Sequence, residues 1–207
     1  MTFTSRFLAP LCGLVCAAGF ISASHAQAAP DAVSEANIAS AAQRSFLEFF
    51  ELLALPNDAT NAADIVKNAD WLQAAFRKRG FVTKLLANKG KPLVFAEYPR
   101  TVANAKTILF YMHFDGQPVI PAQWSQPSPW QSVLKRRGSD GQWQQFDRNA
   151  LLGASVDPEW RLFARSASDD KGPIMMFLTA FDILKSTGAA PVFNVKYCST
   201  ARRRRAR

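Results

Sequence analysis

A chain of 207 residues, of which 48% are hydrophobic and 20% are charged, can hold one globular domain and is too apolar for a disordered protein. The net charge of +9 would suit a nucleic-acid-binding protein, but arginine fills five of the last six positions. The excess positive charge is therefore concentrated in the tail, and a basic domain surface is not indicated.

The first 26 residues have the three parts of a secretory signal peptide. Arg6 supplies the positive charge, residues 7–21 form the apolar run, and Ser24-His25-Ala26 is a small-residue cleavage site, with Ala26-Gln27-Ala28 as a second candidate. The apolar run is short for a membrane span. We therefore expect a periplasmic or secreted protein without a stable membrane anchor.

Cleavage of that segment would leave one histidine, His113, and one cysteine, Cys198. A single cysteine excludes a disulfide within the chain, and it also argues against a thiolate zinc site and Cys-His catalysis. Serine hydrolysis is disfavoured as well, because the chain has no Gly-x-Ser-x-Gly motif.

Two helices are predicted at the start of the mature chain. Apolar residues recur at helical spacing over residues 32–55, and this helix should end near Pro56. A second helix is predicted from Asn61 to Gly80, with a basic triplet, residues 77–79, in its last turn. Basic side chains complement the C-terminus of a helix, so the triplet is assigned no partner.

Strands are predicted after these helices, with one further helix among them. The strands are at residues 81–86, 93–98, 107–113, 161–164 and 191–195, and the helix is at residues 171–185. The strand at residues 161–164, the helix and the strand at residues 191–195 form a crossover unit, which favours parallel pairing of the two strands. We therefore predict an α/β fold, a mostly parallel sheet with helices on both faces.

The segment from residue 116 to residue 160 is less regular, with a turn expected at residues 138–141. Prolines alternate in it with Trp124 and Trp130. Such a segment could wall a pocket, or it could be a loop pinned by two half-buried tryptophans, and both interpretations stay open.

Groups suited to metal chemistry stand at the end of the predicted strand 107–113. His113 and Asp115 are two residues apart, so both side chains point to one side if the extended backbone continues. A neutral imidazole is a good zinc ligand, and a neighbouring carboxylate can fix its tautomer. The same pair is also typical of an ordinary surface interaction. Asp169 lies at a second junction, between a strand and a helix, where Asp170 can be explained as a helix cap or a first-turn carboxylate.

The two junctions read His113-Phe114-Asp115-Gly116-Gln117-Pro118 and Ser168-Asp169-Asp170-Lys171-Gly172-Pro173. Together they resemble the cocatalytic-zinc amidohydrolases and metallopeptidases. That family includes glutamate carboxypeptidase, acetylornithine deacetylase, succinyl-diaminopimelate desuccinylase and the carnosine-type dipeptidases. The resemblance assigns residues 30–196 to the N-terminal part of a zinc-exopeptidase-like catalytic domain.

The resemblance implies a role for each acidic or imidazole group. His113 would bind one zinc ion, Asp169 would bridge two, and Asp115 would serve catalysis by orienting His113. The peptide between Asp169 and Asp170 would be cis, and cobalt or manganese could replace zinc. A water held between the metals would attack the amide carbon of a small peptide or an N-acyl amino acid. A homodimer is expected only of the full-length form.

The chain departs from the family after the strand at residues 191–195. The family carries a Glu-Glu pair at the end of this strand, which supplies the catalytic base and a metal ligand. Residues 197–201 instead read Tyr-Cys-Ser-Thr-Ala and precede the arginine run. We therefore predict a truncated domain that is inactive and folds poorly, because its apolar sheet face would lack covering elements.

Residues 197–207 are predicted to be an aberrant basic tail. The loss of one base after the codon of Lys196 would explain this tail. In the shifted reading frame the codons of residues 197–199 encode apolar residues, which would continue the buried strand. If the following codons end in G, the shifted frame then encodes Asp-Gly-Glu-Glu-Glu-Ala. The alternative is an exported, non-enzymatic protein whose arginines bind nucleic acid or an anionic membrane. We favour the frame accident, since a natural arm would interrupt a strand that the fold needs. No nucleic-acid partner is therefore expected.

Overall fold

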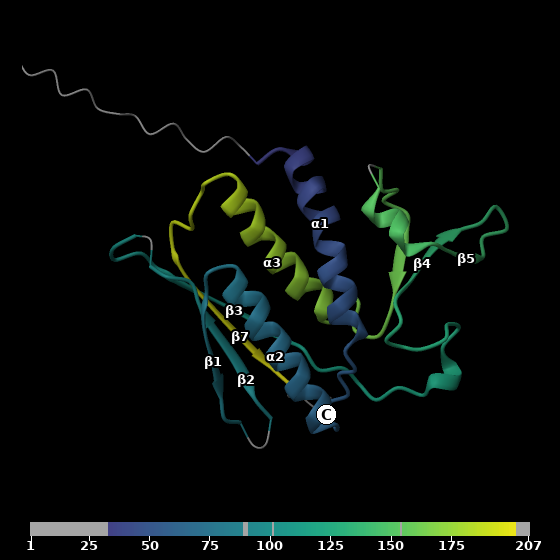
Figure 1. The fold of residues 1–207 in the computed structure, drawn as a ribbon, viewed down its shortest axis with the longest axis horizontal. Helices are drawn as coiled ribbons and strands as arrows, with labels where there is room; N and C mark the ends of the chain where they lie inside the picture. Colours follow the sequence, from purple (N-terminus) through teal and green to yellow (C-terminus); the bar gives the residue numbers. More distant parts are fainter. Residues whose placement is uncertain (1–32, 89–90, 101, 154, 202–207) are drawn as a thin grey trace, which may run out of the picture.

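The computed structural model describes residues 33–88, 91–100, 102–153 and 155–201, so the predicted signal peptide and the arginine run lie outside the described residues. The helices and strands, shown in Figure 1, are α1 (Glu35–Ala54), α2 (Ala62–Lys78), β1 (Val82–Leu86), β2 (Leu93–Glu97), β3 (Thr107–His113), β4 (Val133–Arg137), β5 (Trp143–Phe146), β6 (Arg161–Phe163), α3 (Lys171–Ser186) and β7 (Asn194–Thr200). The predicted α/β class is confirmed. In the described ranges, no helix is long and apolar enough to cross a membrane.

The main sheet has the strand order β1-β2-β7-β3. Strand β3 runs parallel to β7, whereas β7 and β1 both run antiparallel to β2. The described sheet is therefore more mixed than predicted, because a short hairpin joins β1 to β2 and the strands of a hairpin run antiparallel.

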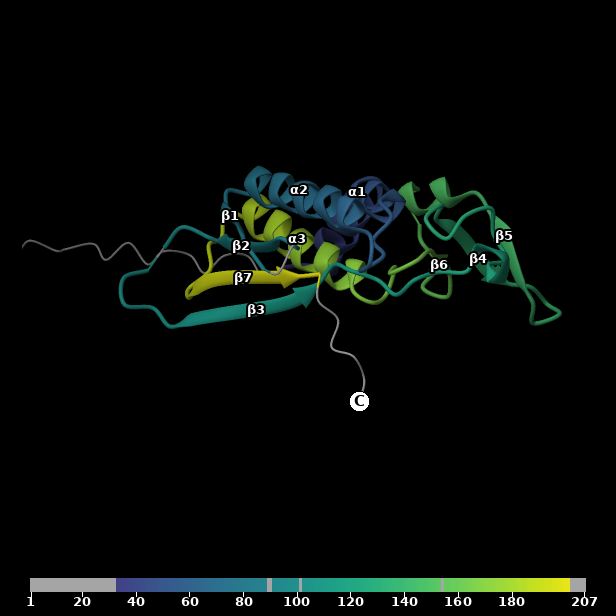
Figure 2. The same cartoon turned by 90° about the horizontal axis from the view of Figure 1, so that it is seen from below.

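Helices α1, α2 and α3 lie on the same side of this sheet, as Figure 2 shows, rather than on both faces. Their apolar stripes need only one sheet face to become buried. The other face carries exposed apolar side chains, and Leu109 and Tyr111 of β3 are 59% and 61% exposed. The expectation of an uncovered apolar face therefore holds for the described residues.

A second sheet, with the order β5-β4-β6, lies beside α1 and away from β1 and β2 (Figure 1). Both of its pairs are antiparallel, and the predicted turn joins β4 to β5 at residues 138–141. Leu134 and Leu151 pack against Phe50 of α1 and bury the inner side of this sheet. The sequence did not predict β4 and β5, because both are short and rich in polar residues.

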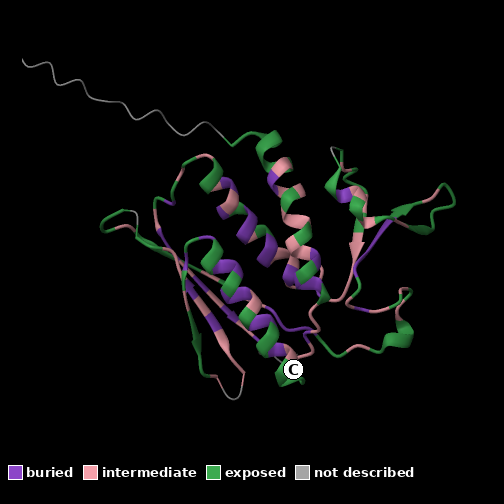
Figure 3. Cartoon of the chain, in the orientation of Figure 1, coloured by how far each residue is buried: buried purple, intermediate pink, exposed green. Residues whose placement is uncertain are grey.

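The main core lies between the helices and the sheet, where the buried segments of Figure 3 face one another. Leu72 and Phe76 of α2, Leu178 of α3 and Tyr197 of β7 are completely buried. The rings of Phe76 and Tyr197 have centroids 4.4 Å apart, which joins α2 directly to β7.

Arg79, the last residue of the basic triplet, is buried rather than solvated. Its guanidinium donates to Glu48 of α1 at 2.8 and 3.1 Å and to Asp182 of α3 at 2.7 and 3.1 Å. It also donates to the carbonyl oxygens of Ala75 and Leu178. Arg79 therefore joins all three helices, a role inside the fold that its position at the end of a helix does not indicate.

Strand β7 continues through residues 197–200, which the sequence predicts to belong to an aberrant tail. Tyr197 and Ser199 are completely buried on the helix side, while Cys198 and Thr200, which alternate with them, are only partly buried. The alternation of side chains along a strand explains this, because polar residues can occupy the open face. Residues 197–200 therefore do not interrupt the strand, whereas the sequence predicts an interruption.

Candidate metal-binding site

The predicted site residues lie at one edge of the main sheet. Because β3 and β7 run parallel, their carboxyl ends meet there, and His113 is paired with Thr200. Asp169 comes from the segment between β6 and α3, immediately before the first turn of α3. In open α/β sheets, ligands bind beyond the carboxyl ends of the strands, which is where these residues are found.

The imidazole of His113 lies between two carboxylates. Its Nε2 atom is 2.8 Å from Oδ1 of Asp169, and its Nδ1 atom is 3.4 Å from Oδ1 of Asp115. Nδ1 also lies 3.1 Å from the backbone oxygen of Asp115. Asp115 is completely buried, whereas the Asp169 side chain is 62% exposed. The outer carboxylate therefore faces solvent, and the inner one orients the ring.

These carboxylates favour the protonated form of the ring. The nearby Asp115 carboxylate is the largest influence, and with further contributions from the Asp115 backbone and Asp169 it raises the pKa of His113 from 6.5 to about 9. Burial of the ring opposes this shift but does not cancel it. A histidine binds a metal through a deprotonated ring nitrogen, so a metal ion and a proton compete for Nε2.

Asp170 connects the two junctions. Its side chain makes no capping hydrogen bond to α3, although the residue occupies the N-cap position. Instead its Oδ2 atom accepts a hydrogen bond from the backbone N–H of His113 at 3.3 Å. The cap explanation is therefore wrong for the side chain. The Asp169–Asp170 peptide is cis, as the resemblance implies.

Lys171 fastens the same junction to α1. It is completely buried, and its ammonium donates to the carbonyl oxygens of Leu52 at 2.7 Å and Leu55 at 2.6 Å. Burial lowers the pKa of Lys171 to about 7. These carbonyls lie at the C-terminal end of α1, where a cation is electrostatically favoured.

Zinc is held in proteins by imidazole nitrogens and carboxylate oxygens. Nε2 of His113 and the carboxylate of Asp169 are donors of that kind and face each other, so they fit one side of a metal site. Within the parts of the chain that the structure describes, no group of three or more His, Cys, Asp or Glu side chains could hold a metal ion. The two donors therefore do not form a closed site.

A buried side chain that the sequence does not indicate lies beside this site. Asn57, in the segment between α1 and α2, is completely buried. Its amide nitrogen donates to the backbone oxygen of Phe114 at 2.8 Å and to Oγ of Ser166 at 3.0 Å. The sequence after Pro56 indicates only the end of a helix, so no signal marked this residue.

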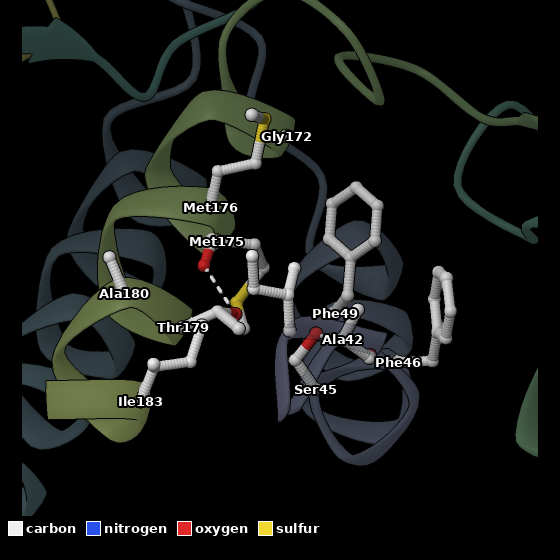
Figure 4. A pocket seen from close by; sticks show the side chains of 11 residues that line it. Ala42, Ser45, Phe46, Phe49, Gly172, Met175, Met176, Thr179, Ala180 and Ile183 are labelled. Atoms are coloured by element: carbon white, nitrogen blue, oxygen red, sulfur yellow. Dashed lines mark hydrogen bonds between the residues drawn. The ribbon is translucent and has the colours of Figure 1, made fainter. Parts of the chain in front are cut away.

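Pockets of the described surface lie elsewhere. An apolar pocket between α1 and α3 is lined by Phe46, Phe49 and Met175, among others (Figure 4). A more polar one is lined by Trp130 and Arg148, so Trp130 does wall a pocket. None of the residues lining either pocket is a predicted site residue, and we assign neither to the metal site.

Comparison with known proteins identifies the fold. No family model and no curated protein matches the sequence. Among solved structures, the dipeptidase Dug1p from Saccharomyces cerevisiae is 16% identical with a TM-score of 0.60, covering 79% of this chain and 33% of its own. The M20 family metallo-carboxypeptidase Sso-CP2 from Sulfolobus solfataricus is 27% identical with a TM-score of 0.56, and 75% of this chain and 30% of that chain are covered. Human carnosine dipeptidase 1 is 17% identical with a TM-score of 0.56, covering 79% of this chain and 34% of its own.

These neighbours are two dipeptidases and an M20 family metallo-carboxypeptidase, and the predicted resemblance is confirmed. The chain spans about a third of the length of these neighbours. With identities this low, the similarity to the two dipeptidases concerns the fold alone.

Proposed function

We propose that this chain is the N-terminal part of the catalytic domain of a zinc-dependent hydrolase that cleaves the amide bond of dipeptides or N-acyl amino acids. The observation that carries the proposal is the 2.8 Å approach of His113 Nε2 to Asp169, with Asp115 on the other side of the ring. The peptidase fold supports it, because the structure neighbours are dipeptidases and a metallo-carboxypeptidase.

Each of the three residues has a separate task. Asp115 attracts the proton of Nδ1, so that the neutral ring keeps its lone pair on Nε2. Asp169 offers carboxylate oxygens at a position open to solvent, where a substrate can approach. Bound zinc would supply a Lewis acid for the amide carbonyl and a water of lowered pKa. Cobalt or manganese would suit the same donors.

We expect the chain to be nearly inactive as it stands. The attack of water on an amide needs a general base within hydrogen-bond reach. After β7 the chain continues with Ala201 and the arginine run, which contain no acidic residue. Asp115 and Asp169 are engaged with His113, so neither is available as that base.

Titration of the purified chain with Co²⁺ tests the metal assignment, because bound cobalt absorbs visible light. We expect weak binding that is lost in His113→Asn and Asp169→Asn. The exposed Asp70 on α2 supplies the matched control, and Asp70→Asn should bind cobalt like the parent chain. Equal binding by the parent and both site variants would contradict the assignment.

Hydrolysis of a dipeptide and of an N-acyl amino acid, followed in the presence of Zn²⁺ or Co²⁺, tests the expected inactivity. Turnover above the buffer rate that disappears with a chelator would show that a base is present after all. The absence of turnover, together with cobalt binding through His113 and Asp169, would support the proposal in full.

A second candidate function is binding of nucleic acid or anionic lipid by the arginine run. The extension of β7 to Thr200 favours it, since the run follows the strand instead of breaking it. Salt-sensitive binding to DNA or to anionic vesicles, lost on deletion of residues 202–207, would support this function. The gene decides between the two proposals, because the frame accident requires codons that spell the acidic motif in the other frame.

We also propose that the first 26 residues direct export to the periplasm or the medium. The N-terminus of the protein recovered from cell fractions tests this, and it should begin at Gln27 or Ala29. An intact Met1 terminus in the cytoplasm would contradict the proposal.

A further inference from the structure

Asn57 is the buried polar residue that touches both loops of the proposed metal site. Phe114, whose backbone oxygen accepts from the Asn57 amide, directly follows His113. Ser166, whose Oγ accepts the second bond, lies three residues before Asp169. One carboxamide therefore joins the chain beyond β3 to the chain before α3.

The backbone around Asn57 strengthens this connection. The N–H of Gly116 donates to the backbone oxygen of Asn57 at 2.7 Å, and the N–H of Ala59 donates to the oxygen of Gly116 at 3.1 Å. Asp58 and Gly116 form a parallel β-bridge. The segment between α1 and α2 is thus paired with the residues immediately after His113.

The three segments meet without spare room. A Cβ atom at Gly116 would lie 2.8 Å from Oγ of Ser166 and 3.1 Å from Oδ1 of Asn57. The first distance is shorter than real Cβ contacts and the second is tight, so a side chain at Gly116 would push Ser166 or Asn57 out of its place. A small change in the length or polarity of the Asn57 side chain must therefore move at least one loop.

The orientation of the amide follows from its partners. The Phe114 carbonyl can only accept a hydrogen bond, so the Asn57 amide must present its nitrogen to it. An aspartate at this position would place a carboxylate oxygen against that carbonyl and would lose both donors. Among the site's other side-chain hydrogen bonds, the Asp170 carboxylate accepts from the end of β3, and the Lys171 ammonium donates to the end of α1.

We infer that Asn57 is a positioning residue of the proposed metal site, which holds the β3 loop and the β6–α3 loop in the register that brings His113 Nε2 to Asp169. This inference rests on the proposed function. Partners behind metal ligands commonly change metal affinity about 10- to 100-fold when they are replaced. Asn57 acts through both loops at once, so its loss should separate the two donors.

The buried Asn68 provides a matched control. It is also completely buried, and its amide nitrogen also donates two hydrogen bonds, to the backbone oxygens of Pro56 at 2.7 Å and Asp64 at 2.8 Å. Neither of those partners belongs to a loop that carries a proposed ligand. Asn57→Asp and Asn68→Asp therefore remove the same chemistry from the same degree of burial at two places.

The experiment measures Co²⁺ affinity and unfolding free energy for the full chain and both variants. We expect both variants to lose stability, but only Asn57→Asp to bind Co²⁺ at least about tenfold more weakly in the folded fraction. Asn57→Ser keeps one donor and should lie between the parent and Asn57→Asp if the latter does not fold. An equal loss of affinity in Asn57→Asp and Asn68→Asp, or no loss in either, would overturn the inference.

A metal-free measurement separates this inference from the proposed function. The ¹⁵N shift of His113 Nε2 reports its contact with Asp169, so Asp169→Asn should change it in the parent chain and in Asn68→Asp. When Asp169→Asn is added to Asn57→Asp or to Asn57→Ser, it should change the ¹⁵N shift of His113 Nε2 much less. Should cobalt fail to bind while this pattern holds, the metal assignment falls and the positioning role stands. An unaltered response in both Asn57 variants overturns the positioning role.

Discussion

The substitution Asp115→Asn tests the electrostatics of the site. Asp115 is completely buried, and its carboxylate, 3.4 Å from Nδ1 of His113, is the main reason that the pKa of His113 rises from 6.5 to about 9. An opposite charge at such a distance shifts a pKa by about 1–3 units. We therefore expect the pKa of His113 to fall by about 2 units in the variant.

The same shift predicts how stability depends on pH. The pKa of His113 is higher in the folded chain than in the unfolded chain, so its contribution is fully present below pH 6.5 and is lost as the pH rises through about 9. One pKa unit corresponds to about 1.4 kcal/mol. The unfolding free energy of the parent relative to Asp115→Asn should therefore fall by about 2 to 3 kcal/mol between about pH 6 and about pH 9.5.

NMR titration of the imidazole signals and urea unfolding, both in the presence of a chelator, measure these quantities. Asp169→Asn is the matched control. Its carboxylate is 62% exposed and contributes least to the raised pKa of His113, so this variant should lower that pKa by less than Asp115→Asn does. A parent His113 that titrates near 6.5, or a pKa unchanged by Asp115→Asn, would refute the reasoning.

Three further predictions concern the fold and the metal. Arg79→Ala leaves two carboxylates without their buried partner and should cost about 3 to 5 kcal/mol in urea unfolding, whereas Lys78→Ala, at a side chain that is 70% exposed, should cost under about 0.5 kcal/mol. A loss of unfolding free energy below about 1 kcal/mol in Arg79→Ala would contradict the role of Arg79 in joining the three helices. The double substitution Leu109→Lys and Tyr111→Lys should lower the self-association of the chain measured by light scattering. Both side chains are exposed on an edge strand, on the sheet face that no helix covers. Unchanged scattering would mean that the chains associate through another surface. Zn²⁺ should raise the thermal midpoint of the parent by a small amount that His113→Asn abolishes, and an equal rise in both would assign the zinc to another site.

Much of the local structure follows from patterns that neighbouring residues create. The spacing of apolar residues placed α1, α2 and α3 within a few residues of their observed bounds, and β3 at residues 107–113 as observed. The pairing of His113 with Asp169 was also expected, but only through the resemblance that the two junction motifs carry. Neither motif shows by itself how the loops approach each other.

The tertiary structure alone decided which polar residues are buried together. Arg79 looks like its neighbours Arg77 and Lys78 in the sequence, and only the packing of α1 and α3 around it supplies Glu48 and Asp182.

The contacts of Asn57 and Asp170 were likewise decided by the tertiary structure, since their hydrogen-bond partners lie at least 57 residues away in the sequence. Helices and strands arise from interactions between near neighbours, so the sequence by itself determined where they form. The hydrogen bonds of a buried polar side chain depend on which distant segments meet around it, and only the folded chain brings those segments together.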